Sequence, residues 1–242
     1  MAGGKQPKSL PQTPVREAAQ AIQLMMTEIE PSSRNEQTAL KRRCLARDNY
    51  RCIATGMSDH SRLPPQGGTV STECAHILPF ALRTFNPDSA QEVEVKAQIW
   101  WAIYRYFPFV KGKINSGNIN TPANAITLWT ETHHEFGIFH IAFEPKNEVN
   151  QYRVHNFTPT TLLTRFLPRS ITLTQSDSAT VMPDPDFLRL HYQVAMILRV
   201  SGIREKFEEI MRENEYNSLY GIQPDGSTNL GHIVTRIMLM DL

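Results

Sequence analysis

Residues 124–143 read NAITLWTETHHEFGIFHIAF, and three of the chain's eight histidines fall in this stretch. The pattern predicts a short strand, a helical turn and a second strand. A structural histidine is usually a single buried ring, so His133, His134 and His140 together favour metal chemistry, because imidazole is the commonest metal ligand. The alternative interpretation is that two of these rings face solvent and one caps a helix.

Outward from this stretch, the sequence predicts a mixed α+β fold. Apolar residues at helical spacing indicate helices over 15–30, 33–48, 89–107, 187–202, 203–214 and 232–240. Short apolar runs bounded by turn residues indicate strands within 51–56, 72–78, 125–128, 138–143 and 151–157. The last two are expected to pair as a hairpin.

The domain organisation follows from changes in composition along the chain. We expect a disordered tail over 1–13, an α+β domain over 14–157 that begins with helices, an irregular connection over 158–185 and a helical C-terminal extension over 186–242. The apolar face of the helix that starts near residue 187 is expected to be buried against the core.

Composition bounds the class of protein. The chain has 242 residues, of which 40% are hydrophobic and 20% charged, as in a soluble globular protein. No long apolar run and no secretory leader pattern occur, which predicts an intracellular protein, nuclear or cytoplasmic and not secreted. The odd number of cysteines favours small buried thiols, with Cys52 and Cys74 as candidate neighbours.

The net charge of +1 gives no global attraction to nucleic acid, so a polyanion partner needs a local basic patch. One basic run lies in residues 41–51. The candidate phosphate-binding side chains are Arg42, Arg43, Arg47, Arg51 and, further along, Arg83. A solvated helix face is the alternative explanation of the run.

Four short motifs occur in a fixed order: RCIATG at 51–56, AHILPF at 75–80, NAITL at 124–128 and HHEFGIFHIAFEP at 133–145. In this order they resemble the HNH endonuclease family, in particular the branch common in fungal proteins. The resemblance covers about residues 40–157.

The resemblance implies a ββα-metal core, here with N-terminal helices, a helical insertion and the C-terminal helical extension. It implies that His76 is the general base that activates water, that Asn124 orients this histidine and that His133 binds a divalent ion. Mg²⁺ or Mn²⁺ is the expected ion, with Zn²⁺ or Ni²⁺ as alternatives, and nucleic acid is the expected partner, DNA rather than RNA. The implied activity is metal-dependent hydrolysis of phosphodiester bonds.

Two positions depart from the family pattern. Relatives often have a metal ligand immediately before the strand histidine and an aspartate four residues after the helix histidine, but these positions hold Ala75 and Gly137. The residues available to replace such ligands are His134, His140, Glu73 and Glu135. The departures support an alternative function, a catalytically degenerate HNH-fold module that binds nucleic acid or another protein.

Overall fold

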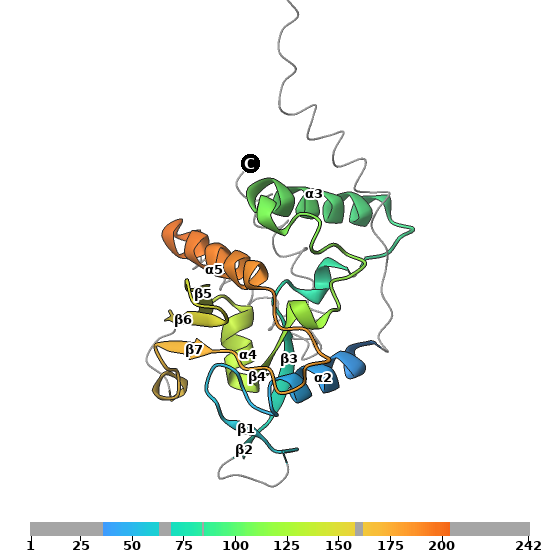
Figure 1. Cartoon of the computed structure of the whole chain (residues 1–242). Coiled ribbons are helices and arrows are strands. Elements are labelled where there is room, and N and C mark those ends of the chain that lie inside the picture. The colour runs from blue at the N-terminus through green and yellow to red at the C-terminus, as the bar shows by residue number, and fades with distance from the viewer. Residues whose placement is uncertain (1–35, 63–68, 84, 158–161, 204–242) are drawn as a thin grey trace, which may run out of the picture.

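The computed structural model describes residues 36–62, 69–83, 85–157 and 162–203, and it confirms an α+β fold (Figure 1). Its helices are α2 (Glu36–Arg47), α3 (Ala90–Tyr106), α4 (Thr130–Gly137) and α5 (Pro185–Val200). Its strands are β1 (Ser58–Asp59), β2 (Thr69–Val70), β3 (Thr72–His76), β4 (Ala125–Trp129), β5 (Ile141–Pro145), β6 (Gln151–Asn156) and β7 (Ser170–Thr172). The tail over 1–13, the helices expected over 15–30 and 232–240, and most of the helix expected over 203–214 lie outside the described residues.

An antiparallel pair of strands, β3 and β4, lies at the centre of the molecule. Their register places His76 opposite Ala125 and Thr72 opposite Trp129. The four residues Ala125 to Leu128 are all buried, which suits the apolar, β-branched content of this run. Helix α4 follows β4 directly and contacts both strands, so the strand histidine and the helix histidines belong to one compact unit.

Helix α2 packs on this strand pair. Leu40 and Cys44 of α2 are buried against Ala125 and Cys74 of the two strands. Cys74 packs beside Cys44, close enough for each thiol to influence the pKa of the other. The neighbour of Cys74 is therefore Cys44, where the sequence had suggested Cys52, and the described cysteines are free thiols.

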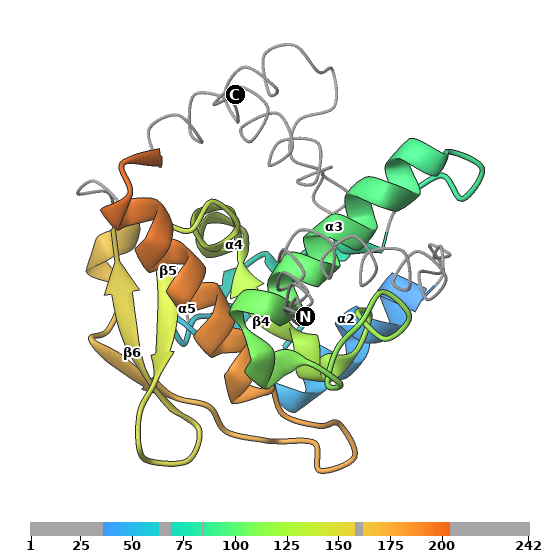
Figure 2. The ribbon, with the colours of Figure 1, turned by 90° about the horizontal axis from the view of Figure 1, so that it is seen from above.

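A second sheet has the strand order β5, β6, β7, with antiparallel pairing throughout. Strand β7 lies within the segment 158–185 that the sequence predicted to be irregular. Its register places Ile171 opposite Tyr152 of β6, and both side chains are buried. Helix α5 lies over β5 (Figure 2), so its apolar face is buried, as expected.

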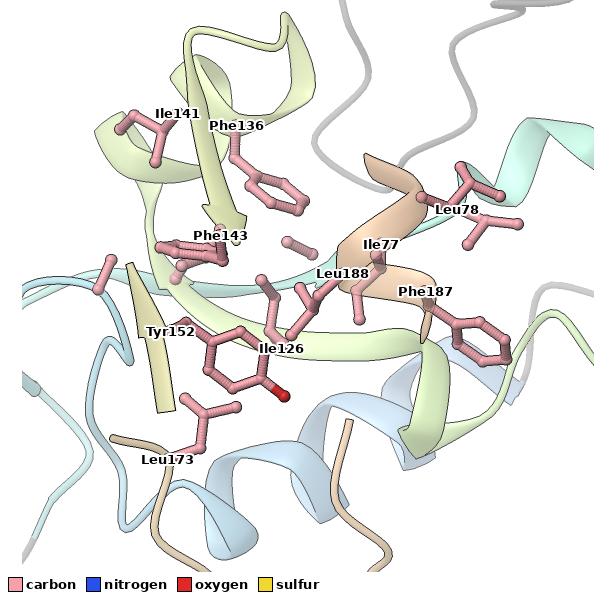
Figure 3. Close-up of a cluster of buried hydrophobic side chains, with 14 of the residues drawn as sticks. Ile77, Leu78, Ile126, Phe136, Ile141, Phe143, Tyr152, Leu173, Phe187 and Leu188 are labelled. Atoms are coloured by element: carbon pink, nitrogen blue, oxygen red, sulfur yellow. The ribbon is translucent and has the colours of Figure 1, made fainter. Parts of the chain in front are cut away.

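The main core fills the space between the two sheets, α4 and α5 (Figure 3). Each of these elements contributes a fully buried side chain: Ile126 from β4, Phe136 from α4, Phe143 from β5, Tyr152 from β6 and Leu188 from α5. The rings of Phe136 and Phe143 stack with their centroids 5.6 Å apart. The second sheet and α5 thus pack against the buried face of α4 and fix its position.

The stretch Arg51 to Gly56 was predicted to be a strand that runs into a glycine turn; the structure has the turn, but only an isolated bridge at Arg51 in place of the strand. The amide of Gly56 donates to the carbonyl of Cys52 (2.8 Å), and Gly56 has a φ of 73°, a left-handed conformation that favours glycine. This turn reverses the chain, and Arg51 then forms an isolated bridge with Ser58. The local turn geometry outweighs the strand preference of the apolar residues.

Helix α3 is the helical insertion, and Ser89 is its N-cap, because the side chain of Ser89 accepts a hydrogen bond from the amide of Glu92. Two side chains attach it to the turn that follows β3. Lys96 Nζ donates to the carbonyl of Ala81 (2.7 Å), and Trp100 Nε1 donates to that of Leu82 (3.3 Å). The insertion therefore supports the segment immediately after His76. Within the described ranges, no helix is long and apolar enough to cross a membrane.

Candidate active site

His76 is the last residue of β3, and its ring is partly exposed. Its Nε2 lies 3.0 Å from Oδ1 of Asn120, and its ring lies 5.3 Å from that of Phe80 between centroids. Burial lowers the pKa of His76 to about 4; the hydrogen bond to Asn120 opposes this, and the charge of His133 adds to it. His76 is therefore a neutral imidazole near neutral pH, with one nitrogen still able to accept a proton.

Asn124 is completely buried at the start of β4. Its Oδ1 accepts from the amide of Leu78 (2.8 Å), and its Nδ2 donates to the carbonyls of Leu78 (2.9 Å) and Ile119 (3.0 Å). Its own carbonyl accepts from the amide of Ile77 (2.9 Å). These contacts fix the backbone directly after His76.

His133 lies on α4, and its Nδ1 is 2.5 Å from Oε2 of Glu73 on β3. Both side chains are partly exposed. An imidazole and a carboxylate are donor types that divalent ions use, and a carboxylate at Nδ1 leaves Nε2 of the histidine as the ligand atom. The chemistry of this pair therefore fits one side of a divalent-ion site.

The other two histidines of the stretch do not join this pair. His134 is exposed in the last turn of α4, whereas His140 is buried and its Nδ1 lies 2.7 Å from Oε2 of Glu135. Across the described part of the chain, no three histidine, cysteine, aspartate or glutamate side chains form a group that could hold a metal ion. The expected set of His133, His134 and His140 is thus not assembled at one site.

The two departures from the family pattern have different surroundings. Ala75 is fully buried on β3, on the same face of the strand as Glu73, where a larger side chain would collide with the core. Gly137 is exposed at the end of α4, and a Cβ built on it would meet no atom within 4 Å. Only the position of Gly137 could accept a ligand side chain without repacking.

Arg47 is a structural residue and not the phosphate ligand that the basic run predicted. Its guanidinium is completely buried and forms a bidentate pair with Asp48 (2.7 and 2.9 Å). It also donates to the carbonyls of Pro122 (2.7 Å) and Ala125 (2.8 Å). Asp48 in turn accepts from the amide of Thr127 (3.0 Å). This network joins the end of α2 to the start and the middle of β4, and its side chains are buried away from any ligand.

The remaining arginines of the predicted interface are more accessible. Arg42 and Arg43 are exposed on α2, whereas Arg51 and Arg83 are half-buried. Arg51 also donates to the carbonyl of Gly56, at 3.4 Å. Exposed cations therefore remain available on α2, while Arg51 and Arg83 are partly covered by the protein.

Sequence reasoning missed Asn120. It lies in a loop rich in glycine and asparagine, and asparagine is so frequent in turns that composition gives no reason to select this one. Its contact with His76 spans 44 positions of sequence, so the only available signal was its nearness to Asn124 along the chain.

Residues 52–144 match the family model described as HNH endonuclease. Comparison with curated proteins and with solved structures gave no match. The matched segment contains His76, Asn124 and His133, together with the β3, β4 and α4 unit that carries them. The family implies a nuclease-type function on nucleic acid, and its members generally use divalent metal ions. By this match, residues 52–144 belong to the HNH endonuclease family.

Proposed function

We propose that the chain is a divalent-metal-dependent endonuclease that hydrolyses phosphodiester bonds, in DNA rather than RNA, with His76 as its general base. The observation that carries the proposal is the convergence of two functional groups on one unit. A neutral histidine ends β3, and a carboxylate–histidine pair joins β3 to α4 close enough for the charge of His133 to act on His76. A base and an ion site side by side are what phosphodiester hydrolysis requires.

His76 would take a proton from a water molecule, whose oxygen then bonds to phosphorus. The bond from phosphorus to the leaving oxygen breaks, and that oxygen takes a proton from solvent. Because burial holds the pKa of His76 at about 4, the imidazole is ready to accept a proton at any pH well above that value. Asn124 supports this step by fixing the backbone at Leu78, two residues after the base.

His133 would hold the divalent ion through Nε2, and Glu73 would orient its ring through Nδ1. The ion, when bound, would supply positive charge for the phosphate and the leaving oxygen. With so few ligands from the protein, a hard ion that keeps several waters is favoured, and Mg²⁺ or Mn²⁺ fits that description better than Zn²⁺ or Ni²⁺. Arg42 and Arg43, exposed on α2, would contact backbone phosphates of a duplex, with Arg51 and Arg83 as further candidates.

The test is nicking of supercoiled plasmid by the full chain with Mg²⁺ or Mn²⁺, with EDTA as the metal-free control. His76→Ala should reduce the rate by about 10²- to 10⁴-fold, the usual contribution of a general base. His60→Ala is the matched control, because the side chain of His60 is 65% exposed and lies outside the site. Nicking that persists in EDTA, or that survives His76→Ala, would contradict the proposal.

A second candidate function is a nucleic-acid-binding module that keeps the fold and has lost hydrolysis. The observation in its favour is the lack of a three-donor group among the described residues, together with Ala75 and Gly137. It predicts a gel shift of the plasmid by wild type, without nicking at any metal concentration. RNA as the substrate would appear as cleavage of a single-stranded or duplex RNA while DNA stays intact.

A further inference from the structure

The contact between His76 and Asn120 determines which ring nitrogen carries the proton. Oδ1 of Asn120 can only accept a hydrogen bond, so the nitrogen 3.0 Å from it must be the donor. In a neutral imidazole only one nitrogen carries a hydrogen. With Asn120 in this orientation, Nε2 of His76 is protonated and Nδ1 holds the lone pair that can accept a proton.

Asn120 is itself held in place by the buried asparagine of the site. Nδ2 of Asn124 donates to the carbonyl of Ile119, the residue before Asn120 (3.0 Å). The amide of Asn124 also donates to the carbonyl of Thr121, the residue after it (2.9 Å). The backbone on both sides of Asn120 is thus tied to Asn124.

Asn124 consequently acts on His76 by two routes. One route is direct, through the backbone at Ile77 and Leu78. The other passes through the loop and ends at the ring, because Asn120 extends from a segment whose carbonyls Asn124 binds. Phe80 lies against the ring with an interplanar angle of 44° and limits its tilt.

We propose that Asn120 is a positioning residue of this site: it holds the ring of His76 with the proton on Nε2 and so makes Nδ1 the atom that accepts the proton of the attacking water. The inference rests on the proposed function for its second half, the use of Nδ1. Its first half, the locked tautomer, is a property of the folded chain whether or not the chain cleaves nucleic acid.

The competing arrangement has the amide of Asn120 turned end for end. Its Nδ2 would then donate to Nε2, and the proton of His76 would lie on Nδ1. The two arrangements have nearly the same heavy-atom geometry but opposite ring protonation. A measurement of the nitrogen chemical shifts therefore decides between them.

The experiment is a long-range ¹H–¹⁵N correlation spectrum of the full chain labelled in histidine, near neutral pH, with the His76 signals assigned from His76→Ala. Wild type should show a protonated Nε2 and an unprotonated Nδ1. Asn120→Ala should give a fast average of both tautomers. Asn120→Asp keeps the acceptor, so it should restore the Nε2-protonated form and raise the pKa of His76. Asn147→Ala, in the exposed turn between β5 and β6, is the control for loss of an asparagine elsewhere.

A proton on Nδ1 in wild type would overturn the proposal, as would an Asn120→Ala spectrum identical to wild type. In the plasmid assay, Asn120→Ala should lower kcat about tenfold, a part of the general-base contribution, with KM unchanged. Asn120→Asp should recover most of that rate, with the acid limb of its pH profile moved to higher pH. A locked tautomer in a chain that does not nick DNA would uphold the positioning of His76 and reject the nuclease function, so the two failures are distinguishable.

Discussion

His191 gives the fold a measurable sensitivity to acid. It lies on α5 with only 3% of its surface exposed, and its Nε2 donates to the carbonyl of Phe136 on α4 (3.0 Å). Its ring stacks on Phe136, with centroids 3.8 Å apart, and on Phe139, at 4.8 Å. Its Nδ1 is buried without a hydrogen-bond partner in the described part of the chain. Burial lowers the pKa of His191 to about 3, although the bond to Phe136 opposes the shift.

The sign of the effect follows from the direction of this shift. The unfolded chain binds a proton at this histidine below about pH 6.5, while the folded chain does not until about pH 3. The contribution of His191 to the free energy of unfolding is therefore complete above about pH 6.5 and is lost as the pH falls toward 3. Because pH 5 lies about 1.5 units below the pKa of the unfolded chain, the free energy of unfolding at that pH is lower by about 2 kcal/mol.

The variant that isolates the pH-dependent contribution of His191 is His191→Phe, which keeps an aromatic ring against Phe136 and Phe139. It loses the hydrogen bond to the carbonyl of Phe136 but also removes the unpaired Nδ1, so its free energy of unfolding near neutral pH should change by about 1 kcal/mol or less. Urea unfolding near pH 7 and pH 5 should show that the variant loses about 2 kcal/mol less than wild type on acidification. His76 titrates in both proteins and cancels. An equal loss in both would refute a buried, neutral His191.

Three further predictions concern the site and its support. Asn124→Ala should lower the free energy of unfolding by about 3 kcal/mol or more, because it leaves three buried backbone groups unpaired. Urea unfolding measures this change, and a loss below about 1 kcal/mol would show that water replaces the amide. Arg47→Lys should cost about 2–4 kcal/mol in the same assay, since an ammonium cannot reproduce the bidentate bonds to Asp48 and the carbonyl contacts, and a neutral outcome would mean that the network tolerates rearrangement. Gly137→Asp adds a carboxylate one helical turn from His133 in open space, so calorimetric Mn²⁺ affinity should rise by about tenfold, with Gly137→Asn as the uncharged control; unchanged affinity would argue that no ion binds near His133.

The sequence predicted the centre of the fold because local and tertiary preferences agree there. The run Ala125–Trp129 is apolar and buried, so its strand preference and its position coincide. They disagree at residues 52–56, where apolar residues favoured a strand but Gly56 reverses the chain. Strand β7 was missed for a different reason. Ser170–Thr172 is very short and lies in a segment rich in threonine, serine and proline, and it becomes a strand by pairing with β6.

The residues proposed for the site differ in the same way. His76, Asn124 and His133 could be proposed from the sequence because each lies in one of the motifs that resemble the HNH family. The basic run gave no such guide, since Arg43 and Arg47 look alike in sequence although one is exposed and the other is the buried partner of Asp48. Only the packing of α2 on β4 separates them. Asn120 likewise acquires its role from a fold contact that no pattern in its loop indicates.

The two halves of the proposed site differ in how completely side chains support them. In the half proposed to hold the base, His76 is neutral, its ring is hydrogen-bonded, and buried polar groups fix the backbone beside it. The half that would hold the ion has a carboxylate–histidine pair and lacks side-chain ligands at Ala75 and Gly137. Weak ion binding changes how much metal is needed, whereas a misplaced base changes the rate once metal is saturating. The two departures from the family pattern should therefore raise the metal concentration that gives half-maximal nicking. The rate at saturating metal should depend instead on His76, Asn120 and Asn124.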